Sequence, residues 1–149
     1  VVASPNIVQS VKTTSQNMQG GGADSSPAWQ DITDLAVSIT SNYSNSKLLI
    51  RVDICFTSSS SQYAPIFRIL VDGAVVGVGN SGVYGIPVPC SFFGSKKGGH
   101  AGMSYLYSGT LSAGQAASIK IQGAKSANRD VYVNEMGSIS QVMVTEIYQ

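Results

Sequence analysis

Hydrophobic and polar residues alternate most regularly over residues 47–57, KLLIRVDICFT. In an extended strand, one face of this segment would carry four apolar residues: Ile50, Val52, Ile54 and Phe56. The other face would carry a mixed set: Leu49, Arg51, Asp53, Cys55 and Thr57. This period of two, rich in β-branched and aromatic residues, predicts a strand with one face on a core. Its other face would then meet solvent or a partner subunit.

Similar alternation predicts further strands at residues 7–14, 35–40, 65–71, 74–78, 103–110, 117–122, 128–133 and 138–148. In the first of these, we expect Ile7 and Val11 to point inward and Lys12 to point outward. Asp72 and Gly73 stand between two strands and signal a type I′ hairpin turn. The last strand is apolar on both faces, which indicates a central position or a subunit packed on its outer side.

Two stretches have the composition of loops. Residues 15–27 contain three consecutive glycines and predict a flexible surface loop, and residues 79–102 are punctuated by Gly and Pro and predict a long loop. No segment has a sustained helical period. We therefore expect one domain over residues 1–149, an all-β, antiparallel β-sandwich of the jelly-roll type with about 8–10 strands. The chain does not begin with Met, so this domain could be the C-terminal part of a longer chain.

Charge is scarce in this sequence. Charged residues make up 11% of the chain, less than half of the usual share of about 25%. A surface of this kind suits a protein whose flanks are covered by neighbours in an assembly. The formal net charge of +1 argues against nucleic acid as a partner. No apolar window approaches the roughly 20 residues of a membrane-spanning helix, so we expect no membrane insertion.

The sequence contains few residues in patterns typical of a catalytic site. His100 is the only histidine, and it has no flanking acid and no serine or cysteine in a nucleophile-elbow context. The acids are scattered, without a pattern that marks a pair for glycoside hydrolysis. Cys55 and Cys90 could form a disulfide, although two small buried thiols are the favoured interpretation. We expect no enzyme activity, no cofactor and no metal site.

Aromatic residues gather in or beside the predicted connections: Trp29, Tyr43, Tyr63, Tyr84, Phe92 and Phe93. Aromatic faces with neighbouring Asn, Gln and Ser are suited to sugar recognition, by stacking on C–H groups and hydrogen bonding to hydroxyls. The competing interpretation, favoured for Trp29, Phe92 and Phe93, is that they close the ends of the sandwich. The candidate receptor-binding residues are Tyr63, Tyr84, Phe92, Phe93 and His100.

Five segments together resemble a family of phage virion proteins. They are the first predicted strand at 7–11, WQDITDLAVSIT at 29–40, SKLLI at 46–50, FRILVDG at 67–73 and SISQVMVTEI at 138–147. The resemblance covers nearly the whole chain and rests on structural residues. The chain departs from the family pattern in the stretch 79–102, which is longer than usual. It also has Thr145-Glu146 where Met-Glu is commoner.

The resemblance implies a module of the virion surface, assembled in the host cytoplasm and often found in tail fibres or tail-associated proteins. It implies a homotrimer that contacts other virion proteins and binds a host cell-surface glycan or protein. Trimerisation would cover outer-face apolar residues such as Leu49. No catalytic or cofactor-binding residue is carried over. The alternatives are a capsid decoration or cement protein (a head fibre) and, third, a carbohydrate-active enzyme.

Overall fold

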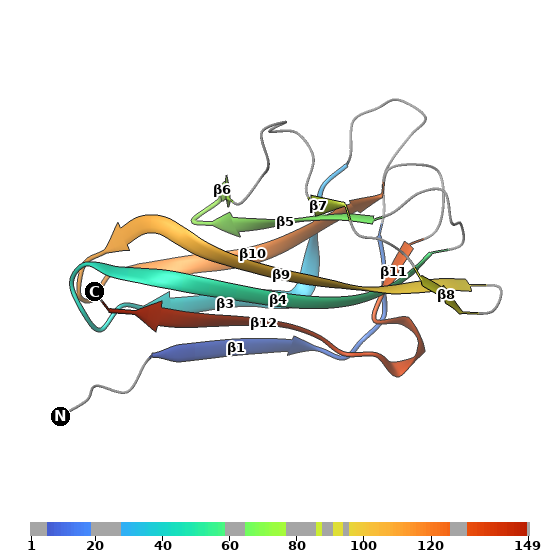
Figure 1. Cartoon of the computed structure of the whole chain (residues 1–149), viewed down its shortest axis with the longest axis horizontal. Helices are drawn as coiled ribbons and strands as arrows, with labels where there is room; N and C mark the ends of the chain where they lie inside the picture. Colours follow the sequence, from blue (N-terminus) through green and yellow to red (C-terminus); the bar gives the residue numbers. More distant parts are fainter. Residues whose placement is uncertain are drawn as a thin grey trace.

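The computed structural model describes residues 6–18, 28–58, 65–76, 86–87, 91–93, 96–125 and 131–148. Two antiparallel β-sheets pack face to face, and the expected all-β sandwich is confirmed (Figure 1). The only helical segment within these ranges is a single 3-10 turn, η1 (Glu135–Gly137). The jelly-roll topology remains a prediction.

The first sheet, here the β4 sheet, is organised around β4 (Ser46–Ser58). On one side, β4 pairs along its whole length with β9 (Lys96–Leu111), which in turn pairs with β8 (Ser91–Phe93). On its other side, the two halves of β4 pair with different strands. The first half pairs with β12 (Ser140–Ile147), followed by β1 (Ile7–Lys12). The second half pairs with β11 (Val131–Val133), followed by β2 (Gln16–Asn17).

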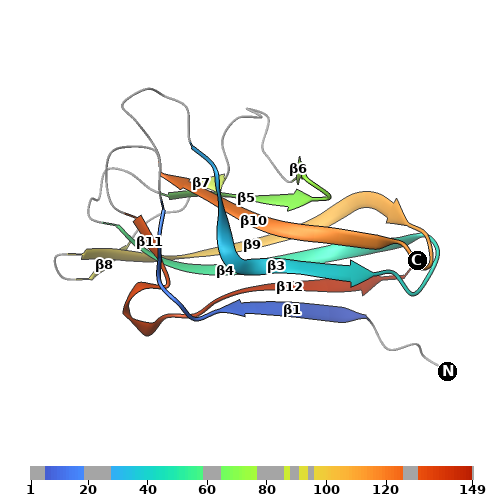
Figure 2. The same cartoon turned by 180° about the vertical axis from the view of Figure 1, so that it is seen from behind.

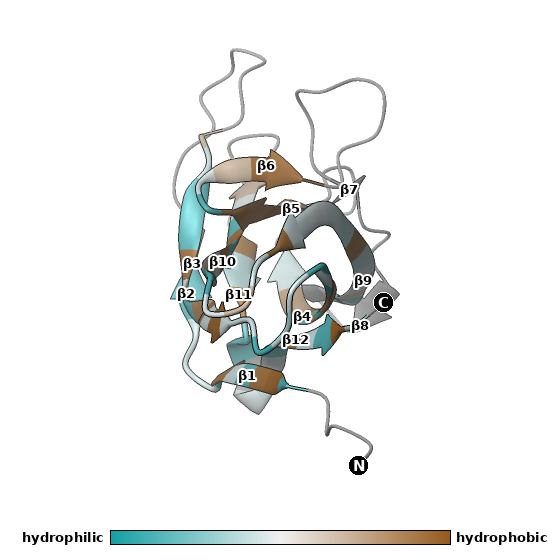
Figure 3. Cartoon of the chain, turned by 90° about the vertical axis from the view of Figure 1, so that its left-hand side faces the viewer, coloured by the Kyte–Doolittle hydropathy of each residue, from teal (hydrophilic) through white to brown (hydrophobic). Residues whose placement is uncertain are grey.

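The second sheet, here the β10 sheet, has β10 (Ala116–Lys125) between β3 (Gln30–Thr40) and β5 (Pro65–Val71). Two short strands, β6 (Ala74–Val76) and β7 (Ile86–Pro87), pair with β5. Figure 3 views the sandwich from one end, with β1 and β6 at opposite edges and hydrophobic positions on both. Twelve strands thus occur in the described ranges, because short strands lie in stretches that had been expected to form loops.

The core forms where the two sheets face each other. The predicted alternation of residues 47–57 is confirmed, because its four apolar residues are buried: Ile50, Val52, Ile54 and Phe56. The facing sheet contributes Phe67, Ile69, Val71, Ile119 and Ile121. Each such side chain contributes about 1.5–3 kcal/mol when it leaves water. The β5–β6 hairpin is also as predicted, since φ is 49° at Asp72 and 81° at Gly73, as a type I′ turn requires.

The expected orientation of β1 is wrong. Ile7 and Val11 point outward, with 52% and 44% of their surface exposed, whereas Lys12 points inward and is 1% exposed. The pairing register explains the difference: Val8 lies opposite the buried Val144 of β12, so Val8 and Lys12 share the inner face. Both faces of this six-residue strand carry polar and apolar residues, so alternation alone could not choose between them.

The expected long loop at 79–102 is also corrected, because β9 begins at Lys96 and continues without a break to Leu111. The glycines that suggested a loop serve close packing instead. A Cβ on Gly99 would lie 2.4 Å from Cζ of Phe56, so only glycine fits opposite this ring. The expected loop at 15–27 is likewise shortened by β2, and the rest of it, from residue 19, lies outside the described residues.

A bend in β3 separates the strand into two parts (Figure 2). Lys120 of β10 pairs with Ala36 and Gln122 pairs with Asp31, so two steps along β10 correspond to five along β3. Asp34 lies in this bulge with φ of 69°, a conformation that Asp adopts more readily than most residues. The bulge brings Asp31 back into register beside Gln122.

Candidate interaction surface

The outer face of the β4 sheet carries the mixed side of residues 47–57, and the strand registers place its side chains in rows. The first row, here the Leu49 row, runs across four strands: Ile7, Thr145, Leu49 and Leu106. Ile7 is 52% exposed and Leu106 is 49% exposed. Single exposed apolar residues are ordinary, but a row of neighbours on one flat face indicates a surface suited to a protein contact.

The next row is mixed in character: Gln9, Met143, Arg51 and Ser104. Arg51 is exposed and forms no ion pair with any residue that the structure describes. Arg51 lies opposite half-exposed Met143 in the register, and no acidic side chain among the described residues pairs with it.

A polar chain crosses the same face two residues further along β4. Gln9 Nε2 donates to Gln141 Oε1 at 2.9 Å, and Gln141 Nε2 donates to Asp53 Oδ2 at 3.1 Å. His100 Nε2 lies 3.5 Å from Asp53 Oδ1. Side chains from β1, β12, β4 and β9 therefore form a polar line on the same face as the Leu49 row.

His100 and Cys55 face each other across β9 and β4. The structure corrects the loop position expected for His100, which lies in β9 and is exposed. Cys55 is a free, half-exposed cysteine, and Cys90 lies outside the described residues. Burial raises the pKa of the Cys55 thiol, and the nearby Asp53 carboxylate raises it further, against an opposing backbone hydrogen bond at Ile139. A thiol that stays protonated at neutral pH is a poor nucleophile.

The other expected receptor-binding residues have different outcomes. Tyr63 and Tyr84 lie outside the described residues. Phe92 and Phe93 form part of β8, where their backbones pair with Lys97 and Lys96. His100 lies further along β9, the strand that β8 pairs with, so the structure places these three residues along the same edge of the β4 sheet.

The outer face of the β10 sheet carries an arrangement that sequence reasoning missed. Trp29, expected to close an end of the sandwich, is half-exposed, and the Arg68 guanidinium lies 4.1 Å above the centre of its ring. Arg68 Nε donates to Gln122 Oε1 at 2.8 Å, and Gln122 Nε2 donates to Asp31 Oδ1 at 2.7 Å. Outward positions of Arg68 and Gln122 follow from strand alternation, but their contact depends on register, which no sequence pattern showed.

Two inward-facing polar clusters hold the sandwich together. At the turn between β3 and β4, the Glu146 carboxylate accepts hydrogen bonds from the Ser41 and Ser46 hydroxyls and the Asn42 and Tyr43 amides. Burial by itself raises the pKa of Glu146, but these four donors outweigh it and lower the pKa to about 2. Glu146 is therefore ionised and stabilises the turn by accepting these hydrogen bonds.

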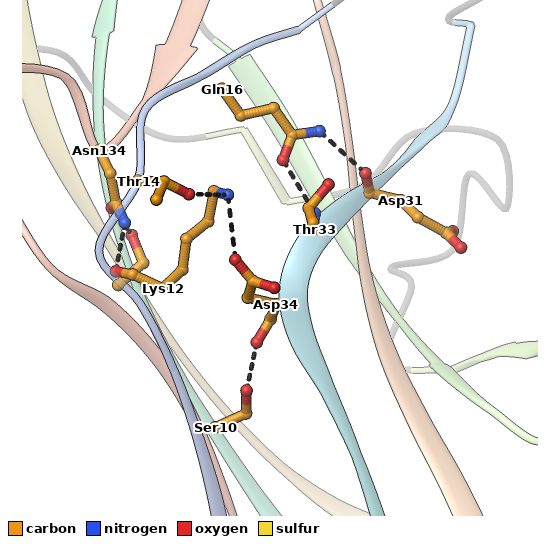
Figure 4. Close-up of polar contacts among 9 residues, drawn as sticks. Ser10, Lys12, Thr14, Gln16, Asp31, Thr33, Asp34 and Asn134 are labelled. Carbon is orange, nitrogen blue, oxygen red and sulfur yellow. Dashed lines mark hydrogen bonds and ion pairs between the residues drawn. The ribbon is translucent and has the colours of Figure 1, made fainter.

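The second cluster surrounds the buried Lys12 (Figure 4). Its Nζ lies 3.2 Å from Thr14 Oγ1 and 3.8 Å from Asp34 Oδ2. The Asn134 amide donates to the Lys12 carbonyl, and the Ser10 hydroxyl donates to the Asp34 carbonyl. These contacts tie β1 to the bend in β3 and to the corner before β12, which is a structural role.

Over the described ranges, no three His, Cys, Asp or Glu side chains gather as a metal ion would require. The same ranges contain no helix long and apolar enough to cross a membrane. In comparisons with known proteins, no protein-family model and no curated protein matches this chain. The surfaces of the molecule and the sequence resemblance are therefore the guides to its function.

Proposed function

We propose that this chain is a non-catalytic module of a phage virion surface, part of a tail fibre or receptor-binding protein, that acts as a homotrimer. The observation that carries the proposal is the outer face of the β4 sheet, where the Leu49 row crosses four strands with Ile7 and Leu106 exposed and Leu49 and Thr145 half-buried. The resemblance to phage virion proteins supports it, as does the low share of charged residues. A jelly-roll topology and attachment to a host-surface glycan or protein belong to the same proposal.

We place a second copy of the chain on this face, because one part of the face carries a cation and another part carries a carboxylate. It presents Arg51, which forms no ion pair with the described residues, and two residues away the partly exposed Asp53 carboxylate, which contacts Gln141 and His100. In a closed ring, Arg51 of one copy meets the Asp53 side of the next, while the Leu49 rows are covered. The same contact would bury the exposed apolar surface and pair the two opposite charges.

The test is the oligomeric state of the purified chain by light scattering coupled to size exclusion. We expect a trimer, and we expect Leu106→Lys to dissociate it by placing a charge in the buried row. The matched control is Val75→Lys, at a residue 37% exposed on β6 of the other sheet, which should stay trimeric. A monomeric wild-type chain, or a trimer that survives Leu106→Lys, contradicts the proposed interface.

Location on the particle separates this proposal from capsid decoration. Antibodies against the chain should label the tail tips of virions by immunogold microscopy. Label on the head would instead assign the chain to capsid decoration. Release of new reducing ends from host polysaccharide would show an enzyme and refute the non-catalytic role.

A further inference from the structure

The outer face of the β10 sheet presents a row of polar side chains whose positions are fixed. The strand registers place Arg68 of β5 opposite Gln122 of β10, and Gln122 opposite Asp31 of β3. The hydrogen bonds along this row are joined by one from Lys120 Nζ to Asp31 Oδ2 at 3.1 Å. Figure 4 shows the Asp31 carboxylate directed away from Gln16, which contacts the Asp31 backbone instead. We refer to Trp29, Arg68, Gln122, Asp31 and Lys120 as the Trp29 surface.

Arg68 is held in place by uncharged groups, and no acidic side chain in the described ranges pairs with it. Its guanidinium group lies over the Trp29 ring, and its Nε donates to the uncharged Gln122 side chain. The two Nη groups form no hydrogen bond with the residues that the structure describes. These Nη groups belong to the planar fork that binds carboxylates in a bidentate manner. Because the Arg68 side chain is already ordered, it loses little conformational entropy when a ligand binds.

The charges of the Trp29 surface do not balance. Arg68 and Lys120 supply two positive charges, and Asp31 supplies one negative charge. Hydrogen bonds from Gln122 and Lys120 lower the pKa of Asp31, which keeps it ionised and engaged at neutral pH. A purely structural network would pair its charges, whereas among the described residues this surface retains one uncompensated cation beside an aromatic ring.

We propose that the Trp29 surface binds a saccharide that carries a carboxylate. The Arg68 fork receives the carboxylate, Lys120 supplies a second charged donor, and the accessible part of the indole receives an apolar C–H face of the sugar. The inference deepens the proposed function by naming the host-surface ligand. It assigns the site to the outer face of the β10 sheet.

The chain contains a single tryptophan, so its fluorescence reports on this surface alone. The full chain is titrated with tetragalacturonate and, separately, with the same tetramer after reduction of its carboxyl groups to hydroxymethyl groups. We expect a saturable change in Trp29 emission with the acidic tetramer and at least about tenfold weaker binding of the neutral one. No saturable change, or equal affinity for both tetramers, overturns the proposal.

Two variants distinguish a binding site from general charge attraction. Lys120→Ala and Lys47→Ala each remove one positive charge, but Lys47 lies on β4 of the other sheet. We expect Lys120→Ala to raise the dissociation constant of tetragalacturonate about tenfold and Lys47→Ala to leave it unchanged. Equal weakening by both variants would mean non-specific attraction and would overturn the site. Arg68→Lys keeps the charge but loses the planar fork, and it should also weaken binding while leaving the melting temperature within a few degrees.

The outcomes also separate this inference from the proposed function. A trimer found at virion tail tips that fails to bind the acidic tetramer would overturn the saccharide site and leave the virion role intact. A chain that binds the tetramer at the Trp29 surface but is not found on virions would leave the site intact and overturn the virion role.

Discussion

Replacement of Glu146 by Gln tests the acid whose pKa is lowered most among the described residues. Glu146 is 4% exposed, and its carboxylate accepts hydrogen bonds from two hydroxyls and two backbone amides, with the Ser41 and Ser46 hydroxyl oxygens at 2.6 Å and 2.5 Å. Glutamine keeps the shape but has one acceptor oxygen, carries no charge, and presents an NH₂ group to donors. The turn between β3 and β4 then loses its charged acceptor.

The magnitude follows from the pKa. The folded-state pKa of Glu146 is about 2, against 4.5 for the ordinary side chain. Each unit corresponds to 1.36 kcal/mol, so ionised Glu146 contributes about 3 kcal/mol to the free energy of unfolding. Because the folded pKa is depressed, this contribution is complete above about pH 5. It declines as the pH falls from the unfolded pKa near 4.5 towards the folded pKa near 2.

The assay is urea unfolding, followed by Trp29 fluorescence at one fixed chain concentration, for the wild type and Glu146→Gln. We expect a difference of about 3 kcal/mol that is constant between pH 6 and pH 7.5 and largely disappears near pH 2. The matched control is Asp72→Asn, which also removes one negative charge. Its amide oxygen can still accept the 2.8 Å hydrogen bond from the Ser118 amide, so it should cost under about 1 kcal/mol. A difference for Glu146→Gln that persists unchanged at pH 2 would refute the reasoning.

Two further predictions concern the β4 sheet. Gly99→Ala should lower the free energy of unfolding by about 1–3 kcal/mol, because its Cβ would lie 2.4 Å from the Phe56 ring. Gly102→Ala on the same strand meets only Asp53 Oδ1 at 3.6 Å and should be nearly neutral, so equal losses in urea unfolding would count against the packing argument. Cys55 in a Cys90→Ser background should react with iodoacetamide more slowly than free cysteine at pH 8, because burial raises its pKa. Mass spectrometry follows this reaction, and a rate equal to that of free cysteine would contradict the raised pKa.

The sequence was most informative where one strand face is clearly apolar. Residues 47–57 have four large apolar side chains on one face, and the hydrophobic effect leaves a single choice of burial. In β1, Ile7 and Val11 compete with Val8 on the opposite face, and the pairing with β12 decides against the more apolar side. The buried Lys12 amine is accommodated because Thr14 and Asp34 meet it, and neither contact is visible from local sequence.

The Trp29 surface could not be predicted for a different reason. Trp29 precedes β3, and the other members come from three strands that are distant in the sequence and meet only after a bulge in β3 shifts the register. Alternation predicts which side of the sheet a residue occupies, but it does not predict which residue lies opposite. The glycines of β9 present the same problem. The sequence around Gly99 has the composition of a loop, and glycine is required there only because the Phe56 ring packs against it.

The position of β4 has a mechanical consequence. This strand is hydrogen-bonded to β9 along its whole length on one side and to β12 and β11 on the other. A pull along the strand axis therefore loads both ladders in shear, so that many hydrogen bonds must break together. A pull across the sheet at β1 would open its ladder with β12 one bond at a time. A domain built in this way resists tension along its strands far better than peeling at its edge, and the direction in which it is tethered decides how much force it can bear.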